Sequence, residues 1–316
     1  MVARARLDRV HLTNVALMLG TGLLAFRWPF EVLVLAYVVL GPAHYLTQIA
    51  WMHRRGYFVG SARGLWLAAP ALPLAALELA GGTLAIPVAA AVYAGTLAVA
   101  LAMVLWPRRR LALAILALAP PVAFALRDVP VFTVGFALLL PTVVHVFVFT
   151  GAFLLVGTLR ARSATAVLQV LVFGLLAVLL FRMPLHAEAF RPAPLIAEAA
   201  DAFAPLARLL GRLSPEGHPD RASVAATRFL AFAYAYHYLN WFSKTRVIGW
   251  AEMPRRTAAL LAATYVATLA SYAVDAHLGF AIAFLLSVAH VLLELPLDAR
   301  TFGKLGAALF GRARAA

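Results

Sequence analysis

The stretch that decides the fold is ATAVLQVLVFGLLAVLLFR, residues 164–182. Apart from the terminal Arg182 it holds no charged residue, and its apolar residues do not alternate with polar ones as in a half-buried strand. A helix of about 20 such residues crosses the hydrocarbon core of a bilayer, where only helices and closed barrels satisfy their backbone. Residues 164–182 therefore predict a transmembrane helix.

The composition of the whole chain agrees with this stretch. Of the 316 residues, 64% are hydrophobic and 13% are charged, whereas a soluble domain is nearer half apolar and a quarter charged. We expect an all-α, polytopic bundle of about ten transmembrane helices that forms one membrane domain over residues 1–316, without a removable signal peptide. The expected spans are 11–27, 29–52, 64–80, 83–106, 111–127, 130–158, 164–182, 224–243, 257–274 and 278–297.

Charge predicts the orientation of the spans. The net charge of +14 comes from basic residues between the apolar runs, so it indicates topology and not nucleic acid as a partner. With residue 1 in the cytoplasm, most Lys and Arg residues fall on the cytoplasmic side, which is the positive-inside bias. We expect a bacterial-type inner (plasma) membrane protein with both termini cytoplasmic. In the outer segment 183–222, apolar residues from Leu195 to Leu213 recur at three or four residues and predict one amphipathic surface helix.

Four of the nine histidines lie inside expected spans: His44, His145, His237 and His290. All four spans run from the outside to the inside. Counting to the next cytoplasmic basic residue places the imidazoles about 10–22 Å from those charges, at about 1.5 Å per residue. They can therefore meet in one layer as metal ligands, with His145 the deepest. The alternative for each histidine is a hydrogen-bonded packing residue.

Polar neighbours accompany three of these histidines. Gln48, Asn240 and Glu294 each follow a histidine by three or four residues, so they share its helical face. Buried polar groups are costly in a membrane, usually face the bundle interior and mark function. We expect these three side chains to form a second polar layer at the catalytic site that orients the imidazoles. Direct ligation by Glu294 is the alternative.

This residue set favours particular chemistry. The chain has no cysteine, and neutral imidazoles suit iron, copper and zinc. Histidines with a nearby carboxylate favour non-haem iron. An iron centre in the bilayer can use dioxygen, which concentrates in lipid, and a lipophilic substrate that enters sideways from the lipid. The sequence therefore predicts a membrane-embedded iron oxygenase whose partners are the lipid bilayer, dioxygen and a lipophilic small molecule.

Two histidine segments resemble a known family. The motif GPAH at residues 41–44, followed by Gln48, and AH at 289–290, followed by Glu294, look like the histidine segments of the Brp/Blh family of integral membrane β-carotene dioxygenases. The first family motif has the form G-x-P-H-G-x-x-D. In this chain proline comes one place earlier, tyrosine replaces the second glycine and Gln48 replaces the aspartate. YHYLN at 236–240 corresponds loosely to the third segment. The resemblance implies that histidines from several helices hold iron for carotenoid or isoprenoid cleavage.

Two other functions fit the same residues. Axial ligands of haem can come from facing helices, as the pairs His44 with His145 or His237 with His290, in a di-haem protein of electron transfer or haem modification. Alternatively, the histidines and Glu294 can relay protons in a proton-coupled transporter. The HxxxH and HxxHH boxes of membrane desaturases are absent, as are phosphate-binding and nucleophile motifs. Iron bound without a haem absorption band is the observation that separates the oxygenase from these alternatives.

Overall fold

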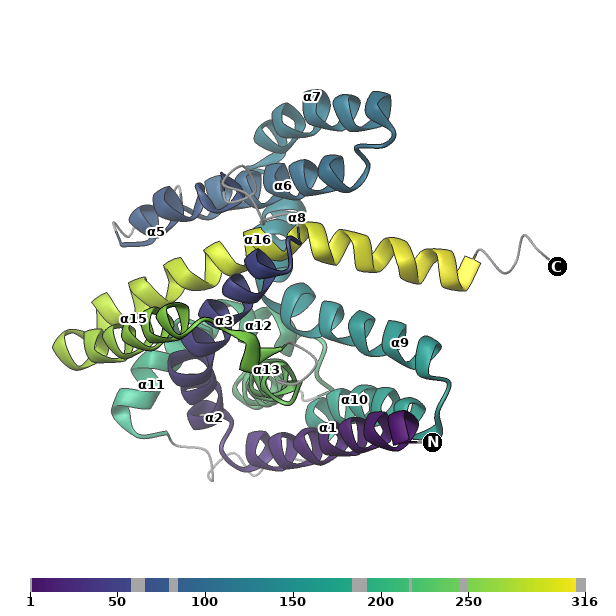
Figure 1. Ribbon diagram of the computed structural model, residues 1–316. Helices are drawn as coiled ribbons and strands as arrows, with labels where there is room; N and C mark the ends of the chain where they lie inside the picture. The colour runs from purple at the N-terminus through teal and green to yellow at the C-terminus, as the bar shows by residue number, and fades with distance from the viewer. Residues whose placement is uncertain are drawn as a thin grey trace. The chain divides into compact units, whose positions relative to one another are not determined.

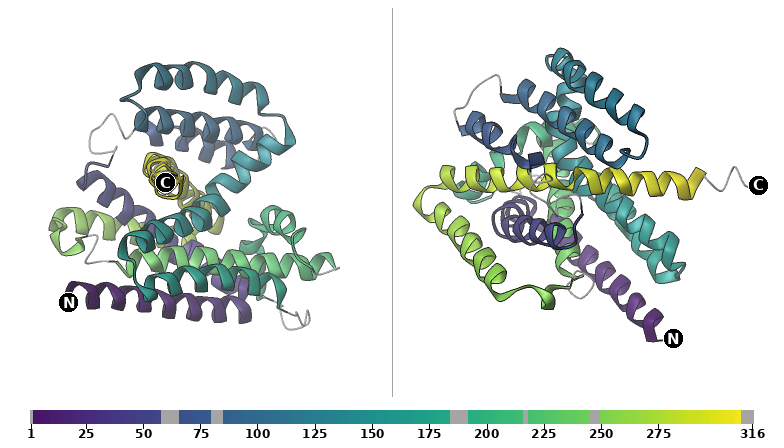
Figure 2. Two further views of the ribbon diagram at one scale, coloured as in Figure 1. Left: turned by 90° about the vertical axis from the view of Figure 1, so that its right-hand side faces the viewer. Right: turned by 45° about the horizontal axis from the view of Figure 1, so that its top comes forward.

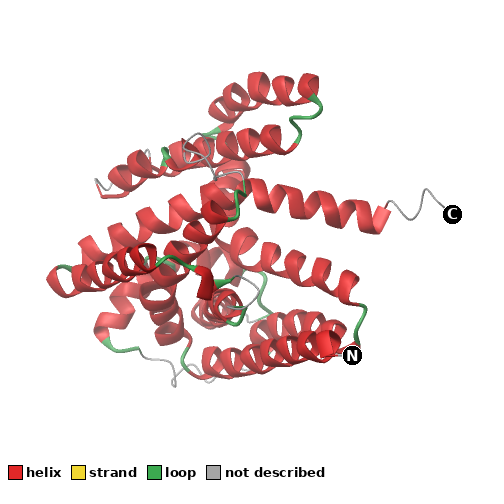
Figure 3. Cartoon of the chain, in the orientation of Figure 1, coloured by secondary structure: helices red, strands yellow, loops and turns green. Residues whose placement is uncertain are grey.

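The computed structural model describes residues 2–57, 66–79, 85–183, 192–215, 218–244 and 249–310. Within these ranges every regular element is a helix and no strand occurs (Figure 3). The predicted all-α class is therefore confirmed. The physical reason is that a helix satisfies its backbone N–H and C=O groups within one segment, so it needs no water and no partner strand.

Eight helical stretches of the described residues are long and apolar enough to cross a membrane. Large apolar side chains on them point outward: Leu171 and Leu260 are 63% and 67% exposed, which suits contact with lipid. The chain is an integral membrane protein, as predicted, and each of the eight stretches overlaps an expected span. They are Leu7–Arg27, Pro29–Arg54, Ile86–Val104, Arg109–Leu126, Pro130–Ala161, Ala164–Arg182, Arg255–Val274 and Ala276–Ala308.

The other two expected spans, 64–80 and 224–243, are not among these eight stretches. In the described part of 64–80 the chain forms the 3-10 turn η2 (Trp66–Ala68) and helix α5 (Ala71–Leu79). Helix α5 reaches only about 14 Å, less than half of a bilayer core. The span 224–243 lies in α13 (Pro219–Phe242), which is long enough to cross but less apolar. Most of α13 is buried by protein, so polar and aromatic side chains are tolerated along it.

The chain forms two compact units, each made of two separated segments. Unit 1 comprises Met1–Leu40 and Val146–Ala251, and unit 2 comprises Gly41–His145 and Glu252–Ala316. The boundary between Ala251 of unit 1 and Glu252 of unit 2 falls within the 3-10 turn η5 (Trp250–Glu252). Neither unit is a continuous stretch of sequence, and the expected single membrane domain stays a prediction.

Unit 1 is organised around α13. Helices α1 (Val2–Arg27) and α10 (Ala164–Arg182) pack against α13 and against each other, as two views show (Figures 1 and 2). Helix α2 (Pro29–Leu35) packs on α13 as well, and α9 (Thr150–Ala161) packs on α10. Because α13 is covered on several sides, its apolar residues contribute to protein packing and not to lipid contact.

A partly buried polar network links the three central helices of unit 1. The Nδ1 atom of His11 lies 2.7 Å from Oε1 of Gln169. The hydroxyl of Tyr236 donates to Oδ1 of Asn14 at 3.2 Å, and Nδ2 of Asn14 donates to the hydroxyl of Ser243 at 3.2 Å. Side-chain hydrogen bonds between membrane helices are worth about 0.6–2 kcal/mol each, so these contacts fix the register of α1 against α13.

In the described part of residues 183–222 the chain forms two short helices in place of the single expected one. These are α11 (Pro194–Asp201) and α12 (Ala204–Gly211). Helix α12 packs on α13, where Leu206 is buried, whereas Leu213 at the end of the stripe is 74% exposed. The side chain of Leu195 lies outside the described residues. The apolar stripe is therefore used in part for packing within unit 1.

Unit 2 is organised around the long helix α16 (Ala276–Phe310). Helices α3 (Gly41–Arg54), α5, α6 (Ala85–Val104) and α15 (Arg255–Val274) all pack against it (Figure 1). Helix α7 (Arg109–Leu126) returns along α6 (Figure 2). Because α16 is the common neighbour, its inward face is the place where polar side chains can be hidden from lipid.

Two π-helical segments occur in the expected spans. Segment η1 (Ala36–Leu40) leads into α3, and η3 (Val134–Phe149) follows the short helix α8 (Pro130–Thr133). Pro141 within η3 has no N–H to donate, so regular α-helical pairing is interrupted there. π turns are rare and often lie at functional sites. Segment η3 carries His145 near its end, and this widened turn sets where the imidazole is placed.

Candidate metal centre

Helix α16 carries three ionisable side chains on one face. His290, Glu294 and Asp298 follow one another at intervals of four residues, the spacing that places side chains on the same side of a helix. All three are buried, with exposed fractions of 0%, 3% and 1%. Burying carboxyl groups away from water is costly unless a partner compensates them. This face is therefore not an ordinary packing surface.

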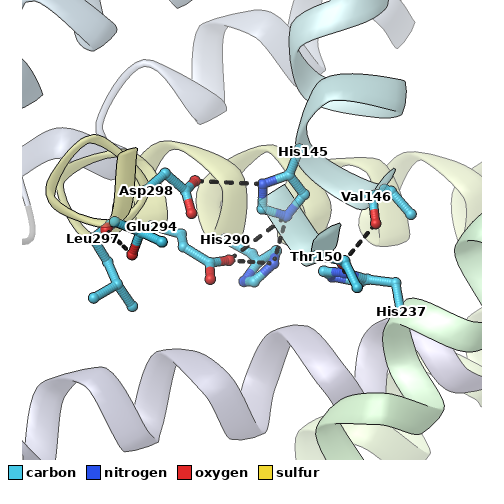
Figure 4. Close-up of polar contacts among 9 residues, drawn as sticks. His145, Val146, Thr150, His237, His290, Glu294, Leu297 and Asp298 are labelled. Atoms are coloured by element: carbon cyan, nitrogen blue, oxygen red, sulfur yellow. Dashed lines mark hydrogen bonds and ion pairs between the residues drawn. The ribbon is translucent and has the colours of Figure 1, made fainter. Parts of the chain in front are cut away.

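His145 lies against that face within unit 2. Its Nε2 atom is 3.2 Å from Nε2 of His290 and 3.6 Å from Oε2 of Glu294 (Figure 4). The Nε2 atom of His290 and Oε2 of Glu294 are 3.4 Å apart. The other nitrogen of His145, Nδ1, lies 3.8 Å from Oδ2 of Asp298. The imidazole of His145 thus stands between the two carboxyl groups of α16.

The three facing atoms have the spacing of metal ligands. A metal ion about 2.0–2.2 Å from nitrogen and oxygen ligands separates neighbouring ligand atoms by about 3.0–3.5 Å. The three observed separations are 3.2, 3.4 and 3.6 Å. His145, His290 and Glu294 can therefore hold a metal ion, and only small side-chain movements are needed to reach ligand distances.

Unsatisfied carboxyl oxygens surround the same point. Oε2 of Glu294 and both carboxyl oxygens of Asp298 are buried and have no hydrogen-bond partner within the described residues. Buried polar atoms in native proteins are nearly always hydrogen-bonded, so each exception needs an explanation. A divalent cation supplies one, since its charge balances that of two carboxylates. The donor set and its charge thus fit a divalent metal ion.

Helix α3 supports this cluster from a second side. The ring of His44 lies 4.8 Å from that of His290, and Tyr45 stacks on His290 at 5.2 Å with an interplanar angle of 29°. Gln48 forms a side-chain hydrogen bond with Glu294. His44, Tyr45 and Gln48 are all buried. These contacts hold the orientation of the two α16 side chains that face His145.

His237 and Asn240 lie on α13 in unit 1. The hydroxyl of Thr150 donates to the backbone oxygen of Val146 at 2.7 Å and also lies 2.7 Å from Nδ1 of His237 (Figure 4). The hydroxyl of Thr150 has a single proton, which it donates to Val146. Nδ1 of His237 is therefore the donor in its contact with Thr150. Because a neutral imidazole carries one proton, Nε2 of His237 carries none. Metal-binding histidines are commonly oriented by such a bond. That His237 and the buried Asn240 serve the same centre stays a prediction.

The sequence predicted most of the cluster in unit 2. Five of the seven predicted site residues lie together there: His44, Gln48, His145, His290 and Glu294. Two of the three residues expected in the polar layer, Gln48 and Glu294, contact each other. Glu294 also lies as close to both facing imidazoles as a ligand does, which agrees with the alternative of direct ligation.

Two members of the cluster were not predicted from the sequence. Asp298 was placed beyond the end of the expected span 278–297, but α16 continues to Phe310 and buries it. Its spacing of four from Glu294 was the signal that could have revealed it. Tyr45 had no such signal, because its contact with His290 depends on how α3 packs on α16.

Comparison with known proteins gives no match to a family model, a curated protein or a solved structure. The functional argument for this chain therefore depends on the geometry and chemistry of its own residues.

Proposed function

We propose that the protein is a membrane-embedded non-haem iron oxygenase that acts on a lipophilic substrate such as an isoprenoid, a carotenoid or another lipid. The observation that carries the proposal is the convergence of two imidazole nitrogens and one carboxyl oxygen in the buried cluster of unit 2. Two histidines and one carboxylate, with coordination positions left open, are the ligand set of non-haem Fe(II) oxygenases. In this assignment the ligands are His145, His290 and Glu294.

The resemblance to the Brp/Blh family supports the same chemistry. Its two clearest segments, residues 41–48 and 289–294, belong to helices α3 and α16, which pack together in unit 2. Their histidines, His44 and His290, have ring centroids 4.8 Å apart. We assign His44 to the centre as a further nitrogen beside the three facing ligands. Cleavage of a carotenoid is the activity that the resemblance implies, and it belongs to this proposal.

Each neighbouring side chain has a definite part in the proposed centre. Bound iron would supply the activation of dioxygen. The hydrogen bond from Gln48 orients the Glu294 carboxyl group, and Tyr45 holds the ring plane of His290 by stacking. Burial of the cluster excludes bulk water, which protects reactive species from side reactions.

A lipophilic substrate follows from the place of the cluster in the chain. Its residues belong to the stretches Pro29–Arg54, Pro130–Ala161 and Ala276–Ala308, all of which are long and apolar enough to cross a membrane. A polar substrate would have to leave water to reach them, whereas an isoprenoid arrives through the lipid. We further propose from the positive-inside bias that both termini are cytoplasmic, and that the membrane is a bacterial-type inner membrane.

The contact between His145 and His290 argues against haem as their shared cofactor. A bis-histidine haem needs a planar porphyrin between its two axial imidazoles. The two Nε2 atoms are 3.2 Å apart, which leaves no room for a macrocycle between them.

A proton relay is the second candidate function. It is favoured by the chain of buried ionisable groups His290, Glu294, His145 and Asp298, since such groups in membrane helices mark proton pathways.

Metal analysis of the purified protein tests the proposal. We expect about one or two iron atoms per chain and no Soret band, because the donor set fits a directly bound ion. His290→Ala should lose the iron. His277→Ala is the matched control, because His277 is an exposed histidine on the same helix. His237→Ala tests whether the unit 1 histidine takes part. Iron retained in His290→Ala would contradict the ligand assignment, and metal-free wild type would favour the relay.

A further inference from the structure

Asp298 is the least explained member of the cluster. It is 1% exposed, and neither of its carboxyl oxygens has a hydrogen-bond partner within the described residues. Its ionisable neighbour across the helix interface is His145, whose Nδ1 lies 3.8 Å from Oδ2 (Figure 4). A carboxyl group buried without a compensating donor destabilises a fold. Packing alone therefore gives no reason for an aspartate at this position.

The position of Asp298 relative to the proposed ligands gives a reason. The Nε2 atom of His145 faces His290 and Glu294, whereas its Nδ1 faces Asp298. A neutral imidazole carries one proton, on one nitrogen or the other. His145 can bind a metal through Nε2 only if its proton is on Nδ1. A carboxylate on the Nδ1 side favours that tautomer, because it accepts the Nδ1–H.

We propose that Asp298 is a positioning residue of the metal centre: it accepts a hydrogen bond from Nδ1–H of His145 and so presents the unprotonated Nε2 to the ion. The inference rests on the metal centre proposed above. The observed separation of 3.8 Å is longer than a hydrogen bond of about 2.9 Å. The proposed hydrogen bond therefore requires the two side chains to come about 0.9 Å closer when the ion binds.

Charge supports the same role. His145, His290 and His44 are neutral as ligands, and Glu294 supplies one negative charge. Asp298 supplies the second charge, so a divalent ion and its surroundings become neutral together. Such outer carboxylates change metal affinity by about 10- to 100-fold when they are removed. The expected loss on removing Asp298 is therefore smaller than the loss on removing a ligand.

Titration of the metal-free, full-length protein in detergent micelles with Co²⁺ tests this role, read by the visible absorption of the bound ion. Asp298→Asn keeps the shape of the side chain and removes its charge. We expect it to weaken Co²⁺ binding by about 10- to 100-fold. The thermal midpoint of the metal-free variant should stay the same or rise, because an uncompensated buried carboxyl group is gone. Asp128→Asn is the control, since that aspartate in unit 2 has a 68% exposed side chain.

The outcomes separate this role from the metal centre itself. Wild-type affinity in Asp298→Leu, which removes the charge and also the acceptor that an asparagine oxygen would keep, would overturn the positioning role and leave the centre standing. If metal-free Asp298→Asn has a lower thermal midpoint than wild type and binds Co²⁺ weakly for that reason, Asp298 is a structural residue. This outcome would also overturn the positioning role. If the asparagine variant does not fold, Asp298→Glu decides, because a retained carboxylate should keep affinity near that of wild type. Absence of Co²⁺ binding by wild type would overturn the metal centre, and this role with it.

Discussion

Replacing Gly41 with alanine should disturb the ring that supports His290. A Cβ atom at position 41 would lie 2.9 Å from the Tyr45 hydroxyl oxygen and 3.1 and 3.2 Å from two of its ring carbons. Tyr45 is only 2% exposed and is stacked on His290. The added methyl group therefore has to displace the tyrosine ring from a filled position.

The size of the effect follows from these contacts. Non-bonded carbon atoms pack at about 3.5–4.0 Å, so the ring of Tyr45 has to retreat by about 0.5 Å. Overpacking of this kind costs about 1–3 kcal/mol. Alanine is the better helix former by about 0.5–1 kcal/mol, which offsets part of that loss. We expect Gly41→Ala to lose a net of about 0.5–2 kcal/mol and to bind Co²⁺ more weakly because His290 loses its support.

Thermal unfolding and Co²⁺ titration of the metal-free protein in micelles measure both effects. Gly95→Ala is the matched control: Gly95 lies within α6 of the same unit, and a Cβ there meets no atom within 4 Å. The control should be as stable as wild type or more stable, with unchanged Co²⁺ affinity. If Gly41→Ala behaves like Gly95→Ala in both measurements, the stacking of Tyr45 on His290 does not support the centre.

Two further predictions concern unit 1. Asn14→Leu should lower the thermal midpoint in micelles, because it removes the hydrogen bonds of Asn14 with Tyr236 and Ser243, each worth about 0.6–2 kcal/mol. An unchanged midpoint would show that these bonds are dispensable. Leu206→Ala should cost about 2–5 kcal/mol because the side chain is buried. Leu213→Ala, at a 74% exposed position, should leave the midpoint unchanged, and equal losses at both positions would contradict the packing of α12 on α13.

Helices could be predicted from the sequence because lipid allows few alternatives to them. Apolar runs near 20 residues predicted eight stretches that the structure confirms as long and apolar enough to span. Hydropathy does not tell protein-facing from lipid-facing side chains, because both surfaces are apolar. The burial of α13 by its neighbours was therefore not visible in residues 224–243, and neither was the division into two units, which depends on packing between distant segments.

The members of the site could be predicted better than its geometry. Intervals of three or four residues correctly related Gln48 and Glu294 to neighbouring histidines. The depth argument for His145 assumed the rise of an α-helix, but His145 lies in the π-helical segment η3, where that rise does not hold. Asp298 was missed because the expected span ended at residue 297, while the helix continues and buries the aspartate beside His145.

The energetics of the cluster favour a binding role over a structural one. Replacing a buried set of ionisable groups by apolar side chains of similar volume is often neutral or stabilising. In a chain that is 64% hydrophobic, apolar packing is the solution used at most buried positions. Unit 2 nevertheless brings Glu294 and Asp298 to either side of one imidazole, with carboxyl oxygens that have no hydrogen-bond partner among the described residues. A divalent cation removes this penalty by balancing both charges and engaging the imidazole nitrogens at once.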